Sequence, residues 1–356
     1  MSELRYGIIG TGMMGVEHIH NLLHVEGVII TALSDPDEGS RGSASDLVPG
    51  ASVYANHRDL LAADECDAVV VASPNMTHVD VLDDVLRTDV HVLVEKPLCT
   101  TVDDCYRVLT LAAGREAITW VGLEYRYMPP IARLIEEVDG DAVGAPRMIA
   151  IREHRFPFLQ KVGDWNRFSR NTGGTLIEKC CHFFDLMNRI MRSPPVRVMA
   201  SGGQDVNHLD EVYDGQAADI LDNAFVIVDF ADGSRGMLDL CMFAEATQYS
   251  EELSVLGSKG KIEAFVPGNI VRVGRRGEHF FGGVESFEVQ DDRIAYQGFH
   301  DGSSYLEHMH FRDAIVHSGA PEVTLEDGLL SVAVGAAAHR SIDEGRPVLL
   351  SELLRD

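Results

Sequence analysis

The sequence is poor in positive charge and has no long apolar run. Its 356 residues include 30 Lys and Arg against 56 Asp and Glu, a formal net charge of −26. The phosphates of nucleic acids and anionic membranes would repel such a chain. No stretch reaches the roughly eighteen apolar residues of a membrane-spanning helix. We therefore expect a cytoplasmic protein with neither a nucleic acid nor a membrane as its partner.

Paired cysteines are also lacking. The six cysteines form no C-x-x-C motif, so we expect reduced, packed thiols and no disulfide framework. Four metal-ligand side chains lie close together, at Glu178, Cys180, Cys181 and His182. Successive helical positions point about 100° apart, so these groups cannot converge on one ion. We predict no metal site.

Glycine, in contrast, is placed where a nucleotide would need it. The apolar run 4–9 is typical of a buried parallel strand, and a helical stretch extends to about Val25. Between them the first glycine permits a tight turn, the second lets the backbone approach a pyrophosphate, and the third lets helix and strand pack closely. The free N–H groups of the helix N-terminus would face the phosphates. We predict a cofactor-binding turn formed by Gly10, Thr11, Gly12, Met13, Met14 and Gly15.

Asp35 follows the second apolar run, 28–34, and lies twenty residues beyond Gly15. A carboxylate there accepts hydrogen bonds from the adenosine ribose and would repel a 2′-phosphate, which favours NAD. Ser34 and Arg41 keep NADP open as an alternative. The competing interpretation is that Asp35 caps the next helix.

Strand and helix patterns continue to alternate up to residue 121. Apolar runs at 67–72, 90–94 and 118–121 predict further strands of one parallel sheet. Ligands bind outside the carboxyl ends of such strands. Two motifs follow strands and are therefore predicted to line the cofactor site: Ser73-Pro74-Asn75 and Glu95-Lys96-Pro97.

Lys96 lies where the nicotinamide end of a dinucleotide would reach. A nearby nicotinamide cation would lower the lysine pKa, and the amine would donate to a substrate oxygen or help take its proton. The competing interpretation is a surface lysine paired with Glu95.

Several segments resemble the family of glucose–fructose oxidoreductase and inositol 2-dehydrogenase (Gfo/Idh/MocA-type oxidoreductases). They are the glycine turn, Ser73-Pro74-Asn75 with His78, Glu95-Lys96-Pro97, and the stretch 173–185. The resemblance implies a Rossmann domain and a C-terminal α/β domain with a large, mostly antiparallel sheet. It also implies NAD(P)-dependent oxidation of a sugar or cyclitol hydroxyl, with Lys96 catalytic and His78 near the cofactor.

The pattern changes after about residue 121. Alternating runs and turn signals predict strands at 147–153, 223–230, 236–243, 252–256, 261–265 and 269–273. Two helices, at 305–317 and 325–344, follow. We expect an α/β protein with a doubly wound parallel domain at 1–124 and a substrate-binding and oligomerisation domain at 125–356.

The stretch from Thr175 is predicted to be one helix carrying a polar stripe. Glu178, His182 and Asp185 are spaced four and three apart and would share one face. His182 would accept a hydroxyl proton, and Glu178 would orient it or bind a substrate hydroxyl. The competing interpretation is a buried histidine with a glutamate partner. The family carries an Asp where this chain has Glu178, which leaves substrate specificity open.

A polar and aromatic loop precedes this helix. Aromatic faces and forked donors suit carbohydrates, so Trp165 and Arg167 are predicted to bind substrate, and Arg126 is a weaker candidate. The other interpretation is an ordinary surface loop.

Together these features predict a dehydrogenase that oxidises a secondary hydroxyl of a sugar, sugar derivative or inositol, with Lys96, Glu178 and His182 catalytic. A homodimer or homotetramer is implied by the resemblance. The alternatives are an NAD-dependent glycosidase, a non-catalytic NAD and sugar sensor, and a dehydrogenase of small hydroxy acids or amino-acid intermediates.

Overall fold

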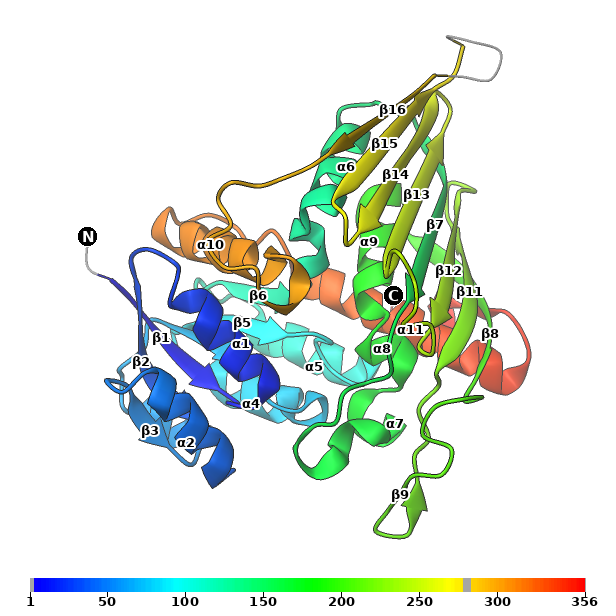
Figure 1. Ribbon diagram of the computed structural model, residues 1–356. Helices are drawn as coiled ribbons and strands as arrows, with labels where there is room; N and C mark the ends of the chain where they lie inside the picture. Colours follow the sequence, from blue (N-terminus) through cyan, green and yellow to red (C-terminus); the bar gives the residue numbers. More distant parts are fainter. Residues whose placement is uncertain (1–2, 278–282, 356) are drawn as a thin grey trace.

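The structure is a computed structural model that describes residues 3–277 and 283–355, and these residues form two large β-sheets (Figure 1). The first is a six-stranded sheet in the order β3-β2-β1-β4-β5-β6, with every neighbouring pair parallel. This is the order of a doubly wound dinucleotide-binding domain, as predicted. Its strands are β1 (Leu4–Ile9), β2 (Val28–Ser34), β3 (Ser52–Tyr54), β4 (Ala68–Val71), β5 (His91–Glu95) and β6 (Thr119–Gly122).

Helices cover both faces of this sheet, so its central strands are buried. All four residues of β4 are buried, which explains why this strand is an uninterrupted apolar run. The helices connecting the strands are α1 (Met13–Leu22), α2 (Glu38–Leu47), α3 (His57–Ala62), η1 (Asn75–Thr77), α4 (His78–Val85) and α5 (Val102–Ala112). Two C-terminal helices complete the cover, since α10 (Ser303–Val316) contacts α1 and α11 (Leu325–Glu344) contacts α5 and β6.

The second sheet has nine strands in the order β16-β15-β14-β13-β7-β12-β11-β8-β17. Only the β7–β12 pair is parallel, so the prediction of a mostly antiparallel sheet is confirmed. Its strands are β7 (Pro146–His154), β8 (Pro195–Gly203), β11 (Asn223–Phe230), β12 (Arg235–Cys241), β13 (Glu251–Gly257), β14 (Gly260–Val266), β15 (Ile270–Arg275), β16 (Gly283–Glu288) and β17 (Val348–Leu349). A small separate hairpin joins β9 (Val212–Tyr213) to β10 (Gln216–Ala217).

Helices pack on the second sheet through α6 on β14 and β15, α9 on β7 and α11 on β8. Strand residues alternate between buried and exposed, and Phe225 on β11 is 63% exposed. The remaining elements after β6 are η2 (Glu124–Tyr127), α6 (Pro129–Asp139), η3 (Val162–Arg167), α7 (Ser169–Thr172), α8 (Thr175–Glu178), α9 (Cys181–Met191), η4 (Gly298–His300) and η5 (Leu350–Glu352).

The single helix predicted from Thr175 is wrong. The helix is interrupted after Glu178: the chain forms the short helix α8, and α9 begins at Cys181, although Lys179 and Cys180 keep right-handed helical dihedrals. Glu178 therefore belongs to α8, whereas His182 and Asp185 belong to α9. None of the helices in the described residues combines the length and apolarity needed to cross a bilayer.

Candidate active site

The glycine turn after β1 has the geometry that a pyrophosphate requires. Gly10 has φ 91°, and a Cβ there would lie 2.5 Å from the backbone nitrogen of Ser73. A Cβ on Gly15 would lie 2.0 Å from the Gly10 carbonyl oxygen, so neither position accepts a side chain. Gly12 faces open space and caps α1 without a side-chain hydrogen bond. The first N–H groups of α1 are thus free for an anion, and the turn fits a dinucleotide.

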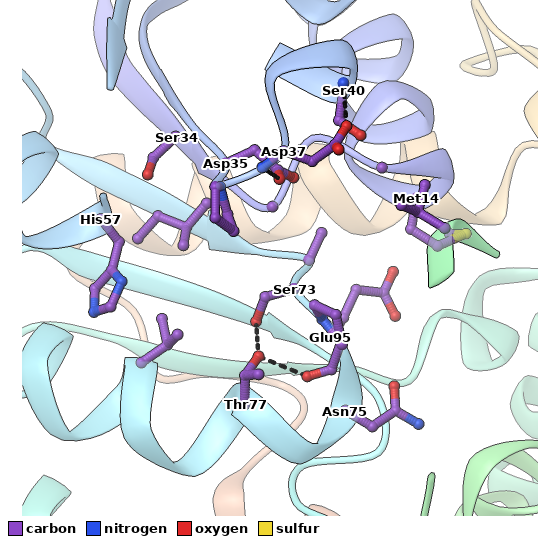
Figure 2. A pocket seen from close by; sticks show the side chains of 18 of the residues that line it. Met14, Ser34, Asp35, Asp37, Ser40, His57, Ser73, Asn75, Thr77 and Glu95 are labelled. Carbon is purple, nitrogen blue, oxygen red and sulfur yellow. Dashed lines mark hydrogen bonds between the residues drawn. The ribbon is translucent and has the colours of Figure 1, made fainter. Parts of the chain in front are cut away.

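A cavity of about 650 Å³ opens from this turn. It extends from the end of β2 past η1 to the end of β5 (Figure 2). It also reaches the loop before η3. Predicted site residues that line it are Gly10, Gly12, Met13, Met14, Asp35, Ser73, Pro74, Asn75, Glu95, Lys96 and Trp165.

Asp35 ties the glycine turn to the end of β2. Its two carboxylate oxygens accept the backbone N–H of Thr11 at 2.7 Å and of Asp37 at 2.8 Å. The cap of α2 is Asp37, which accepts the Ser40 N–H, so the interpretation of Asp35 as the helix cap is wrong. The carboxylate borders the cavity where ribose hydroxyls would lie, and the Arg41 guanidinium beside it binds the carbonyls of Asp35 and Pro36.

The loop after β4 is held rigidly against the cavity. The Thr77 hydroxyl contacts the Ser73 hydroxyl and the Pro74 carbonyl, each at 2.7 Å (Figure 2). The buried amide nitrogen of Asn75 has no hydrogen-bond partner among the described residues, so it is available to a ligand. His78 does not line the cavity. Its ring nitrogens contact the carbonyls of Ser73 and Pro97, so it fastens the loops after β4 and β5 to each other.

Glu95 is the anionic neighbour of Lys96. Burial opposes the charge of this carboxylate, but the hydrogen bond and charge of His18 lower its pKa to about 2. The distance from His18 Nε2 to Glu95 Oε1 is 2.9 Å, and the other carboxylate oxygen accepts the Lys96 N–H. Glu95 thus supports the loop and places a negative charge next to the Lys96 ammonium.

The Lys96 side chain points inward and is not a surface lysine paired with Glu95. Its Nζ donates to the carbonyl oxygen of Glu178 at 3.3 Å, at the break between α8 and α9. Burial opposes its charge, but Cys181, Glu95, Glu124 and Glu178 together raise the pKa above its usual value. These carboxylate neighbours favour the charged ammonium form of Lys96, which can donate a hydrogen bond; the effect of a bound nicotinamide cation on this pKa stays a prediction.

Among the described residues no hydrogen bond or ion pair joins Glu178 to His182, so Glu178 does not orient His182 directly, and its alternative role of binding a substrate hydroxyl stays a prediction. The nearest cation to the Glu178 carboxylate is Lys161, at 3.7 Å. The nearest carboxylate to His182 Nε2 is Glu124, at 3.8 Å. Burial, with the charges of Lys96 and Lys179, holds the pKa of His182 well below its usual value, so its imidazole is neutral.

Two predicted substrate residues are held by ion pairs away from the cavity lining. Arg126 is bound by Asp185 and Asp327, and the nitrogen Nε of Arg167 donates to Glu211 at 3.0 Å. Trp165 does border the cavity, and the Lys161 ammonium lies 4.7 Å from its ring centre. Lys161, which also lines the cavity, therefore joins the predicted loop to Glu178.

Comparison with known proteins gives the family. Residues 4–123 match the oxidoreductase family of the Gfo/Idh/MocA type, NAD-binding Rossmann fold, and residues 135–350 match its C-terminal alpha/beta domain. The chain belongs to this oxidoreductase family. It is an NAD-dependent oxidoreductase, as the sequence predicted.

The names of individual relatives of this oxidoreductase describe several different activities. Myo-inositol 2-dehydrogenase of Thermotoga maritima is 28% identical, covering 99% of this chain and 100% of that protein. The 2,7-anhydro-N-acetylneuraminate hydratase of Mediterraneibacter gnavus is 26% identical, over 99% of this chain and 98% of that one. Levoglucosan dehydrogenase, solved in complex with NADH, has the same fold, with a TM-score of 0.86, 16% identity and coverage of 98% and 99%.

Sequence reasoning missed two polar residues next to the Lys96 end of the oxidoreductase cavity. Glu124 begins η2, two residues after β6, and His300 ends η4. The signal for Glu124 was present, because it follows a parallel strand as Lys96 does. No sequence pattern marks His300, which reaches the site through a long connection. Among residues 3–277 and 283–355, no group of three or more His, Cys, Asp or Glu side chains is arranged to hold a metal ion.

Proposed function

We propose that this oxidoreductase oxidises a secondary hydroxyl of a sugar, sugar derivative or inositol with NAD⁺. The main support for the proposal is the set of residues at the two ends of the cavity. The cavity begins at the glycine turn and Asp35 and ends at Lys96, whose amine reaches the segment that carries His182. The name of the Thermotoga relative supports a cyclitol or sugar as substrate.

In this proposal each part of the cavity binds a different part of the cofactor. The glycine turn with Thr11, Met13 and Met14 would hold the pyrophosphate, and Asp35 would bind the ribose. The segments after β4 and at the end of β5 would hold the nicotinamide half of the cofactor; they carry Ser73, Pro74, Asn75, Glu95 and Pro97. His78 would connect these two segments. A bound NAD⁺ supplies the hydride acceptor. NADP stays open as an alternative cofactor.

Lys96 and His182 have different roles at the substrate hydroxyl. The Lys96 ammonium, with its raised pKa, donates a hydrogen bond to the hydroxyl oxygen and stabilises the negative charge that develops there. The neutral His182 accepts the hydroxyl proton. Glu178, Trp165 and Lys161 would contact the other hydroxyls, whereas the ion pairs of Arg126 and Arg167 give these two residues a supporting role.

A panel of inositols, sugars and sugar acids tests this function. Each compound is incubated with the protein and NAD⁺ or NADP⁺, and reduced nicotinamide is followed by absorbance. Accumulation of NADH with a polyol, lost in Lys96→Ala, supports the proposal. Release of an aglycone or water without net NADH would instead identify a redox-neutral enzyme, and tight NAD binding with no turnover would identify a sensor.

We also propose a homo-oligomer and a two-domain chain, 1–124 and 125–356, divided within η2. The exposed face of the second sheet carries apolar side chains that a second copy would cover, among them Met199, Phe225 and Met237. Size-exclusion chromatography with light scattering on Phe225→Glu tests this, because an unchanged oligomer would contradict it. The cytoplasmic location stays a prediction.

A further inference from the structure

Glu124 is a buried carboxylate placed at the same sheet edge as Lys96. Strand β6 pairs with β5 in parallel, with Gly122 opposite Glu95, so the residues that follow the two strands emerge side by side. Glu124 is only 2% exposed, and neither of its carboxylate oxygens has a hydrogen-bond partner among the described residues. A buried carboxylate without a partner is costly, so its retention requires an explanation other than stability.

Two imidazoles face this carboxylate. Glu124 Oε1 lies 3.5 Å from His300 Nδ1 and 3.8 Å from His182 Nε2. The Tyr125 ring orients both groups, since it stacks on His182 with 4.0 Å between ring centres and lies 5.8 Å from the centre of the His300 ring. The Glu178 carboxylate, in contrast, is next to Lys161.

We propose that Glu124, and not Glu178, is the carboxylate partner of His182, a positioning residue that stabilises the imidazolium formed when His182 takes the proton of the substrate hydroxyl. This inference rests on the proposed function. When the hydroxyl O–H bond breaks, its proton passes to His182, and the positive charge of the imidazolium that forms is stabilised by the Glu124 carboxylate, 3.8 Å from Nε2. The O–H electron pair forms the carbonyl, and the carbinol C–H pair leaves as hydride to NAD⁺. His182 needs this partner because its low pKa makes it a weak base when it acts alone.

The arrangement makes oxidation dependent on the charge of Glu124. Burial and the charge of Glu95 raise the pKa of Glu124 to about 8, although Lys96 and Lys179 oppose this. At lower pH Glu124 is protonated and cannot stabilise the positive charge of His182. The titratable or charged groups that surround it are Glu95 at the end of β5, Lys96 after it, Lys179, Cys181 and His182 at the α8–α9 junction, His300 on η4, and Glu307 on α10.

A histidine NMR titration of the full chain tests the inference without any substrate. The signals of His182 and His300, assigned with His182→Asn and His300→Asn, should shift together near pH 8 as Glu124 ionises. The shared step should vanish in Glu124→Gln. It should remain in Glu251→Gln, a matched control that removes another buried glutamate whose pKa is about 8. A wild-type protein with no shared step, or a step that persists in Glu124→Gln, would overturn the proposal. The wild-type titration decides the matter even if Glu124→Gln fails to fold.

Activity provides the second readout once the panel yields a substrate. In Glu124→Gln, kcat for oxidation should fall at least about tenfold and lose its rise between pH 7 and pH 9, while the KM for NAD⁺ stays within about twofold. An unchanged pH profile of kcat would contradict the inference. If no compound is oxidised, the proposed function fails, and the titration still decides whether Glu124 and the two histidines form one unit.

Discussion

Arg126 Nε donates to Asp185 Oδ2 at 2.7 Å, and this buried ion pair joins η2 to α9. The segment that carries Glu124 and Tyr125 is thereby fixed against the helix that carries His182. The Arg126 guanidinium also donates to the Glu322 carbonyl, so one side chain connects three parts of the chain. Arg126 thus connects the elements that carry Glu124 and His182.

Removal of one partner from this pair should destabilise the protein strongly. Asp185→Ala leaves the Arg126 charge buried without its main partner, and we expect a loss of about 3–5 kcal/mol in the free energy of unfolding. The control is Asp139→Ala, which removes an exposed partner of both Arg189 and Arg192 and should cost about 1 kcal/mol or less. Chemical denaturation measures both. Equal losses would show that the buried pair has no special role.

Asp35 should set the cofactor preference. In Asp35→Ser the carboxylate that would repel a 2′-phosphate is gone while Arg41 remains, so the affinity for NADP⁺ relative to NAD⁺ should rise at least about tenfold. Calorimetric titration with each cofactor checks this. Asp37→Ser retains a capping oxygen for α2 and should change the ratio less. An unchanged ratio in Asp35→Ser would remove Asp35 from cofactor recognition.

Lys161 should act on substrate binding more than on chemistry. Lys161→Met removes the partner of Glu178 and the cation over Trp165, both beside the cavity. We expect the KM for the polyol to rise about tenfold, with kcat and the KM for NAD⁺ changed about twofold or less. The control is Lys259→Met on the exposed pair with Asp141. If Lys161→Met instead lowered kcat as much as Lys96→Ala, Lys161 would belong to the proton chemistry.

Glu251 should make stability depend on pH. Burial and the nearby Glu153 raise its pKa in the folded protein to about 8, against an ordinary value of 4.5. The folded state therefore binds more protons than the unfolded state between these values, so stability from this group is present at low pH and is lost as pH rises through 8. Glu251→Gln should raise the Tm relative to the wild type more at pH 8.5 than at pH 5, by about 2–4 °C. A difference that does not change with pH would contradict this.

The sequence allowed five of the six strands of the first sheet to be predicted, all but the short edge strand β3, because strand, turn and helix signals there are local. The turn after β1 can be recognised from Gly10 and Gly15, and strand β4 from its uninterrupted apolar run. The second sheet was predicted in class but not in order, since nothing local reveals that β7 lies between β12 and β13. Strands β8, β16 and β17 were missed: β17 has only two residues, and the burial of β8 does not alternate regularly along its nine residues.

The site was predicted in part for the same reason. Lys96 and Asn75 follow strands, and their positions at the sheet edge could be inferred. The break at Lys179 and Cys180 could not, because the helical spacing of Glu178 and His182 continues through it. The partners that replaced the predicted contact, Glu124 for His182 and Lys161 for Glu178, come from other elements and depend on tertiary packing.

Transfer of deuterium tests the central claim most directly, namely that the Lys96 end of the cavity passes hydride from a carbinol carbon to the nicotinamide. The protein is incubated with NAD⁺ and inositols or sugars deuterated at their carbinol carbons, and the reduced cofactor is weighed by mass spectrometry. We predict reduced nicotinamide that is heavier by one mass unit, formed by the wild type and lowered about 10²–10⁴-fold in Lys96→Ala at unchanged affinity for NAD⁺. Reduced cofactor without deuterium, or none with any polyol, would contradict the account.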